Sequence, residues 1–181
     1  MYFSKSEVTL SNEMRLIWEQ HVSWTRMTIE SIVFDLPNAE PVTARLLRNP
    51  RDMAEIFRHY YGNQIAFRLK ELFTEHLVIA AELVKAAKAG DNAKVEDANR
   101  RWYRNANEIA GFLAQINPFW SEMKWRGMLH EHLRLTFAEA ATMLKGDYAA
   151  DIELYDEIEL QALMMADEMT RGIIRQFSSE F

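Results

Sequence analysis

The chain has 181 residues, the usual length of one domain, and 49% of them are apolar, including ten Phe, six Tyr and five Trp. We therefore expect a single domain, residues 1–181, whose core is large enough to fold without disulfides or structural metals. The formal charge of −6, with acidic and basic residues interspersed, excludes the basic face of a typical nucleic-acid-binding protein. No nucleic-acid partner is expected.

The sequence contains no cysteine, which excludes disulfides, thiolate metal ligands and cysteine nucleophiles and is typical of a reducing cytoplasm. The segment Met1–Leu10 has no apolar core of signal-peptide length. No apolar run approaches the roughly 18 residues that a membrane span needs. We expect a cytoplasmic protein with no membrane partner.

All predicted elements are helices, because an apolar rhythm of 3.6 residues runs between the few Pro and Gly residues and strand alternation is absent. The rhythm predicts helices at 11–36, 63–89, 92–116, 119–145 and 148–178, with broken helical pieces across 40–61. Predicted helix starts have an N-cap before a proline at Asn49-Pro50 and Asn117-Pro118. At Gly90-Asp91 and Gly146-Asp147, we expect a left-handed glycine to end one helix and the aspartate to be the N-cap of the next.

An internal repeat of about 55 residues relates three parts of the chain. Each copy has a histidine fourteen residues before a turn: His21 before Asp35, His76 before Gly90 and His132 before Gly146. The short connections predict antiparallel neighbours, so the fold class is an all-α, up-and-down bundle of three tandem helical hairpins. The first copy is degenerate, because Pro41 and Pro50 interrupt its returning helix and Gly62 ends it.

The three histidines are candidate metal ligands. Each interrupts an apolar helical stripe and is expected to point inward, at a common height in three parallel helices. Counting the same distance back along the returning helices leads to polar residues that face them: Asn105, Glu108, Asp156 and Glu159. Three imidazoles completed by Glu159, with Asp156 or Glu108, suit one or two divalent ions such as zinc or iron. An enzyme of this kind would be a metal-dependent hydrolase or oxidoreductase.

The alternative is that the histidines are hydrogen-bonded core residues, repeated because the hairpin was duplicated. The protein would then be a metal-free interaction module, with a homodimer formed through the aromatic start of the helix 119–145, at Phe119, Trp120 and Trp125. Kinase and dehydrogenase chemistry is disfavoured because the sequence has no glycine-rich phosphate loop and no strand–helix alternation.

Several segments resemble a family of small uncharacterised bacterial helical proteins. They are Trp18–Arg26, Arg101–Ala106, Gly146–Asp151 and Gln161–Asp167. Some members of that family carry an acetylglutamate kinase name, and the resemblance implies an all-helical bacterial domain. More distantly, one histidine on each of three helices is similar to the DinB-like metal-binding bundles, and the compact hairpins are similar to ferritin-like folds. These likenesses imply a bundle architecture and, for the DinB-like proteins, a metal site.

Overall fold

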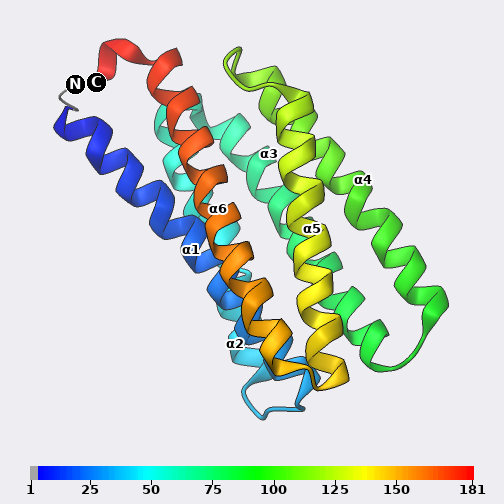
Figure 1. The fold of residues 1–181 in the computed structure, drawn as a ribbon. Helices are drawn as coiled ribbons and strands as arrows, with labels where there is room; N and C mark the ends of the chain where they lie inside the picture. The colour runs from blue at the N-terminus through cyan, green and yellow to red at the C-terminus, as the bar shows by residue number, and fades with distance from the viewer. Residues whose placement is uncertain (1–3) are drawn as a thin grey trace.

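The computed structural model describes residues 4–181, so the beginning of the segment analysed for a signal peptide lies outside the described residues. Within this range the chain forms six α-helices and a short 3₁₀ turn, and five of the helices are long (Figure 1). Their bounds are α1 Lys5–Val33, α2 Ala39–Leu46, α3 Asn49–Lys88, α4 Asn92–Ile116, α5 Glu122–Lys145 and α6 Tyr148–Gln176. The predicted all-α class is confirmed.

The second and third hairpins are the antiparallel pairs α3–α4 and α5–α6, which end where the sequence predicts. Gly90 and Gly146 have positive φ angles of 68° and 77°. The side chains of Asp91 and Asp147 then cap the next helices by accepting from backbone N–H groups three residues further on. These four residues stop one helix and start another because glycine adopts the left-handed conformation at little cost.

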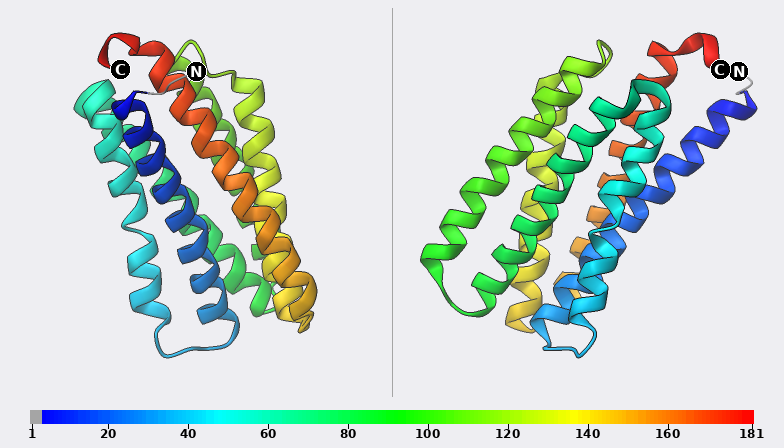
Figure 2. Two further views of the ribbon diagram at one scale, coloured as in Figure 1. Left: turned by 60° about the vertical axis from the view of Figure 1, so that its left-hand side comes forward. Right: turned by 180° about the vertical axis from the view of Figure 1, so that it is seen from behind.

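The first hairpin starts earlier than predicted, whereas its returning limb is broken and ends at Gly62 as the sequence predicts. Helix α1 starts at Lys5 rather than residue 11, behind a capping box formed by Ser4 and Glu7. Its returning limb consists of α2 and residues 49–61 of α3. At Gly62 the chain turns back on itself, and residues 63–88 then run parallel to α1 (Figure 2). The six limbs therefore alternate in direction.

The predicted proline-based helix starts are wrong in both cases. At Asn49-Pro50 the helix begins one residue earlier, after Arg48, and the side chain of Asn49 is fully buried instead of capping. At Asn117-Pro118, Asn117 ends α4, and α5 begins only at Glu122 with Ser121 as its cap. The amide of Asn49 is used in tertiary contacts to His21 and Ile17. The amide of Asn117 donates to Tyr61, while its oxygen still accepts locally from the backbone N–H of Phe119.

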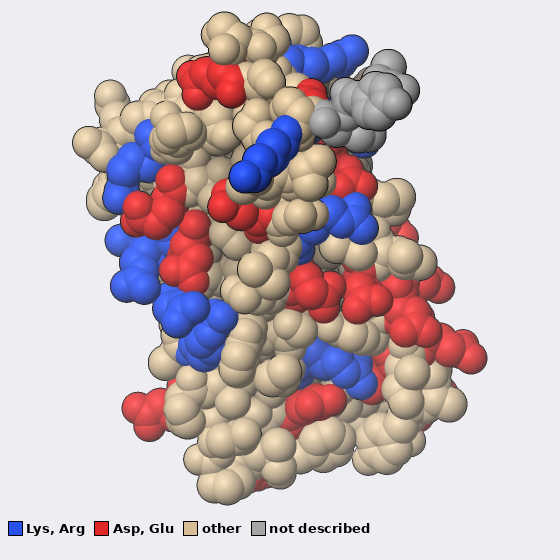
Figure 3. Space-filling model, turned by 90° about the vertical axis from the view of Figure 1, so that its left-hand side faces the viewer, with Lys and Arg blue, Asp and Glu red and all other residues tan. Residues whose placement is uncertain are grey.

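The hairpins close on each other. Helix α1 packs along α6 and also contacts α3 and α5, and α3 contacts α5. The three histidine-bearing helices therefore surround a common core, and the start of α1 lies beside the end of the chain (Figure 1). No helix in residues 4–181 has a stretch long and apolar enough to span a membrane. On the face shown in Figure 3, acidic and basic side chains are interspersed.

Replacing Gly62 by alanine tests the reversal inside α3. Gly62 has φ 80° and ψ 176°, a conformation that other residues hardly adopt, although a Cβ there would touch no neighbour within 4 Å. We expect Gly62→Ala to lower the free energy of unfolding by about 1–3 kcal/mol in urea denaturation, through backbone strain alone. The control is Gly127→Ala in the second turn of α5, where a Cβ also meets nothing. It should stabilise the protein by about 0.5–1 kcal/mol. Equal effects of the two changes would contradict this account of the turn.

Candidate functional site: a buried histidine layer

His21, His76 and His132 lie in the core on α1, α3 and α5. Each side chain is almost completely buried, with 2–3% of its surface exposed. The rings of His21 and His132 are neighbours, with centroids 5.7 Å apart. Trp18 and Trp102 pack against His21 and His76, with ring centroids 5.7 and 5.4 Å away. We call these three imidazoles the histidine layer.

Each imidazole forms the same hydrogen bond, from Nδ1 to an amide side chain on the returning limb of its own hairpin. The pairs are His21 with Asn49 (3.2 Å), His76 with Asn105 (2.9 Å) and His132 with Gln161 (3.2 Å). The nitrogen of each amide donates to the backbone carbonyl four residues before its histidine: Ile17 (2.9 Å), Leu72 (3.1 Å) and Met128 (2.7 Å). The unit of histidine, amide and carbonyl is thus repeated three times.

This arrangement determines the tautomer of each ring. A backbone carbonyl can only accept, so the amide must turn its NH₂ group toward the carbonyl and its oxygen toward the imidazole. The amide oxygen also only accepts, and therefore Nδ1 must carry the proton. In all three copies the lone pair of the neutral ring is then on Nε2, which has no hydrogen-bond partner among residues 4–181.

Burial keeps the three rings neutral. It lowers the pKa of His21 to about 4 and that of His76 to about 3, and it lowers the pKa of His132 well below its usual value. The proximity of His21 further lowers the pKa of His76 and of His132, because a second positive charge in the same layer would be repelled. Neutral imidazole is the form that binds metals.

The predicted carboxylates do not join the layer. Glu108 and Asp156 are exposed, and Glu108 lies 3.9 Å from Arg68 and 4.0 Å from Arg104 across the surface. Glu159 is only half-buried. Successive helix residues are rotated by about 100°, so Glu159 and Asp156 point away from the direction of Gln161, which takes the inward position. The inward position on α4 belongs to Asn105.

A metal ion fits this layer only in part. Two imidazoles that share a tetrahedral zinc ion through bonds of 2.0–2.1 Å have ring centroids about 5 Å apart, close to the spacing of His21 and His132. The Nδ1 hydrogen bonds are also of the kind that orient metal-binding histidines. Across residues 4–181, however, no group of three or more His, Asp or Glu side chains is placed to hold a metal ion. The imidazoles have suitable donor chemistry but do not form a complete ligand set.

Asn49 and Gln161 were missed as site residues by the sequence analysis. The signal was present, because the amide follows its histidine by 28, 29 and 29 residues in the three copies. Aligning the repeat on this second position as well as on the histidine would have selected them. Asn49 was assigned to a helix cap instead, since an asparagine followed by a proline is typical of a helix start.

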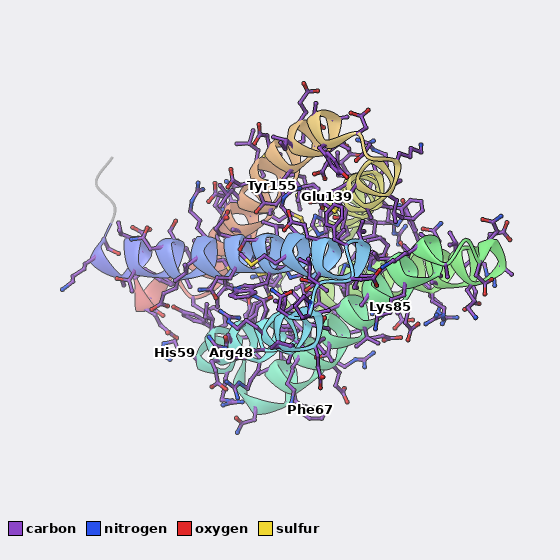
Figure 4. All side chains as sticks on the ribbon, turned by 90° about the horizontal axis from the view of Figure 1, so that it is seen from below. Arg48, His59, Phe67, Lys85, Glu139 and Tyr155 are labelled. Atoms are coloured by element: carbon purple, nitrogen blue, oxygen red, sulfur yellow. The ribbon has the colours of Figure 1, made fainter. Side chains whose placement is uncertain are left out.

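A second buried polar cluster joins α1 to the third hairpin. The guanidinium of Arg26 donates to Glu139 (2.7 Å) and to Asp151 (2.7 Å), both of which are buried, and it lies 4.8 Å from the ring centre of Tyr155. Figure 4 shows Glu139 and Tyr155 on the neighbouring helices of that hairpin. Burial raises the pKa of Glu139 to about 7, against the opposing effect of Arg26.

This Arg26 cluster is not part of the repeat. The positions equivalent to Glu139, seven residues after the other two histidines, are Thr28 and Leu83. Each buried carboxylate of the cluster has a charged partner, so the cluster fastens α1 to α5 and α6.

No family model, curated protein or solved structure matches the chain. The geometry of the site therefore carries the functional argument.

The pH dependence of stability tests the neutral buried histidines, in protein treated with a chelator. The three rings stay unprotonated in the fold but take up protons below pH 6.5 when the chain unfolds, which lowers the free energy of unfolding as the pH falls. Glu139 acts in the opposite sense, because the folded carboxyl keeps its proton up to about pH 7 and the unfolded one releases it near 4.5. Three protons less one leave two, so we expect a slope of up to about 2.7 kcal/mol per pH unit between pH 4.5 and 6.

The matched variant Glu139→Gln removes the opposing carboxyl and should make this slope steeper. Urea midpoints measured at several pH values give both slopes. A wild-type protein whose stability is unchanged, or rises, on going from pH 6.5 to 5 would contradict the assignment of buried neutral imidazoles.

Proposed function

We propose that the protein binds one divalent transition-metal ion, zinc or ferrous iron, through the imidazoles of the histidine layer. The observation that carries the proposal is the threefold repeat of the unit in which an amide fixes the proton on Nδ1 and leaves the Nε2 lone pair without a partner. An imidazole nitrogen that is in no hydrogen bond can bind a ligand, and three such nitrogens in one layer favour a shared ligand.

The ligands would be His21 and His132, whose spacing is already close to that of a shared ion, and His76 after a shift of its side chain toward them. Asn49, Asn105 and Gln161 would orient the three rings from the second layer. A bound ion of this type supplies a Lewis acid with positions open to water or another small ligand. Glu108 and Asp156 lie at the surface, so neither can act as a general base beside the imidazoles. The proposal is therefore limited to metal binding. The resemblance of the sequence to DinB-like metal-binding bundles, one histidine on each of three helices, supports this proposal.

The second candidate is a metal-free interaction module, and it is favoured by the incomplete ligand set in residues 4–181. In that case the histidine and amide units only specify how the hairpins pack. The aromatic start of the helix 119–145 offers less surface for a dimer than the sequence suggests, because Trp120 and Trp125 are buried and only Phe119 and Met123 are exposed.

Metal content separates the two candidates. We expect protein purified without chelator, after growth with added zinc or iron, to contain about one metal ion per chain by elemental analysis. His132→Gln removes a ligand and should lower the affinity for Co²⁺ or Zn²⁺ at least tenfold, because even orienting residues contribute about 10–100-fold. His59→Gln is the control, since His59 is exposed and outside the layer. It should bind as the wild type does.

Chelation provides the second readout, because metal that binds only the folded protein adds to its stability. We expect a chelator to lower the Tm of the wild type and of His59→Gln, but not that of His132→Gln. Metal well below one per chain in every preparation, with a Tm that a chelator does not change, would refute metal binding and leave the packing role.

A further inference from the structure

A small, partly open cavity lies next to the histidine layer. Its volume is about 20 Å³, and its lining includes Thr25, Ala80 and Thr136. Each of these residues follows one of the three histidines by four positions. Four residues correspond to about one helical turn, or 6 Å along the axis. The cavity is therefore one turn away from all three imidazoles, on the side of the hairpin turns that follow them.

The cavity marks a gap in the apolar packing. The buried apolar residues form two separate clusters, a large one that includes Leu83 and Trp102 and a small one that includes Ile29, Ile32 and Val84. Side chains of both clusters line the cavity. Protein interiors are normally close-packed, so a void at the boundary of two clusters is a feature of this fold and not a general looseness.

The surface of the cavity is almost wholly apolar. Among its threonines, the hydroxyls of Thr25 and Thr28 donate to backbone carbonyls of their own helix, at 2.7 and 2.8 Å. Trp102 Nε1 and Thr136 Oγ1 have no hydrogen-bond partner, but both atoms are buried behind the cavity wall. A buried water needs two to four polar partners, and cavities lined by apolar groups stay dry and take up apolar ligands.

We infer that this cavity is a binding site for one small, uncharged, apolar molecule of gas size. The cavity has room for about one or two water molecules, which excludes ligands with more than a few heavy atoms. The inference stands on packing and does not depend on metal binding. Its consequence is that a gas-sized molecule, of the class to which dioxygen belongs, would be held one helical turn from the imidazoles.

Xenon is the probe of choice, because it is inert, monatomic and apolar. The experiment follows methyl resonances of the full-length protein by NMR under increasing xenon pressure, in protein treated with a chelator. We expect saturable shifts for the methyl groups that line the cavity, such as those of Ile29, Leu77 and Val84, and none for Ile158, which lies in the large cluster away from it.

Two variants test the location. Ala80→Leu fills the cavity and should abolish the saturable shifts, whereas Ala87→Leu, on the same helix but outside the lining, should retain them. Thr136→Val replaces an unpartnered hydroxyl by a methyl of similar shape and should leave xenon binding intact. If Ala80→Leu does not fold, the smaller change Ala81→Val at the same wall serves in its place.

Absence of saturable shifts in the wild type would overturn the inference. So would a bound water detected by nuclear Overhauser contacts to the same methyl groups and lost in Thr136→Val. Either result leaves the metal measurements unaffected, because those are made on different residues and with a different probe.

Discussion

The fold depends on how three imidazoles are buried together in a largely apolar core. An imidazole has two polar nitrogens, and leaving either without a partner in such a core is costly. The protein satisfies one nitrogen of each ring with an amide, and it satisfies the amide with a backbone carbonyl of the helix that carries the ring. Because the amide comes from the returning limb, each hairpin is held together at its middle as well as at its turn.

The same unit fixes the register within each hairpin. An amide that must reach both an imidazole and the carbonyl one turn before it allows only one sliding position between the two limbs. In the first hairpin this requirement falls on Asn49, whose limb is otherwise unlike the other two. The capping role that its sequence context favours is given up, which shows that the contact to His21 outweighs the local preference.

The sequence predicts the helical class, the second and third hairpins and the inward direction of the histidines, because all of these follow from apolar periodicity and from glycine stops. It also predicts that Gly62 ends the returning limb of the first hairpin, but not that the chain reverses there without a loop, because the residues around Gly62 keep a helical pattern. It misses the beginning of α1, which starts at Lys5 behind the capping box of Ser4 and Glu7. The predicted positions of the carboxylates are wrong because counting residues from the turn gives the position along the helix axis but not the side of the helix on which a side chain lies. Asn105 and Gln161 occupy the inward positions. Glu159 and Asp156, two and five residues before Gln161, are rotated by well over 90° from it, and Glu108 lies at the surface.

The seam between α1 and α6 has a wider consequence. These helices pack along each other as closely as the two limbs of a hairpin do, although no turn connects them, and the start of α1 lies beside the end of the chain. In topological terms the molecule is a nearly closed ring of three hairpins that happens to be cut at this seam. Arg26, with the buried carboxylates Glu139 and Asp151, holds this seam together at the end opposite the chain termini. A circularly permuted chain, joined across this seam and opened between the second and third hairpins at Pro118-Phe119, would keep the contacts of the core and move the cut to another seam.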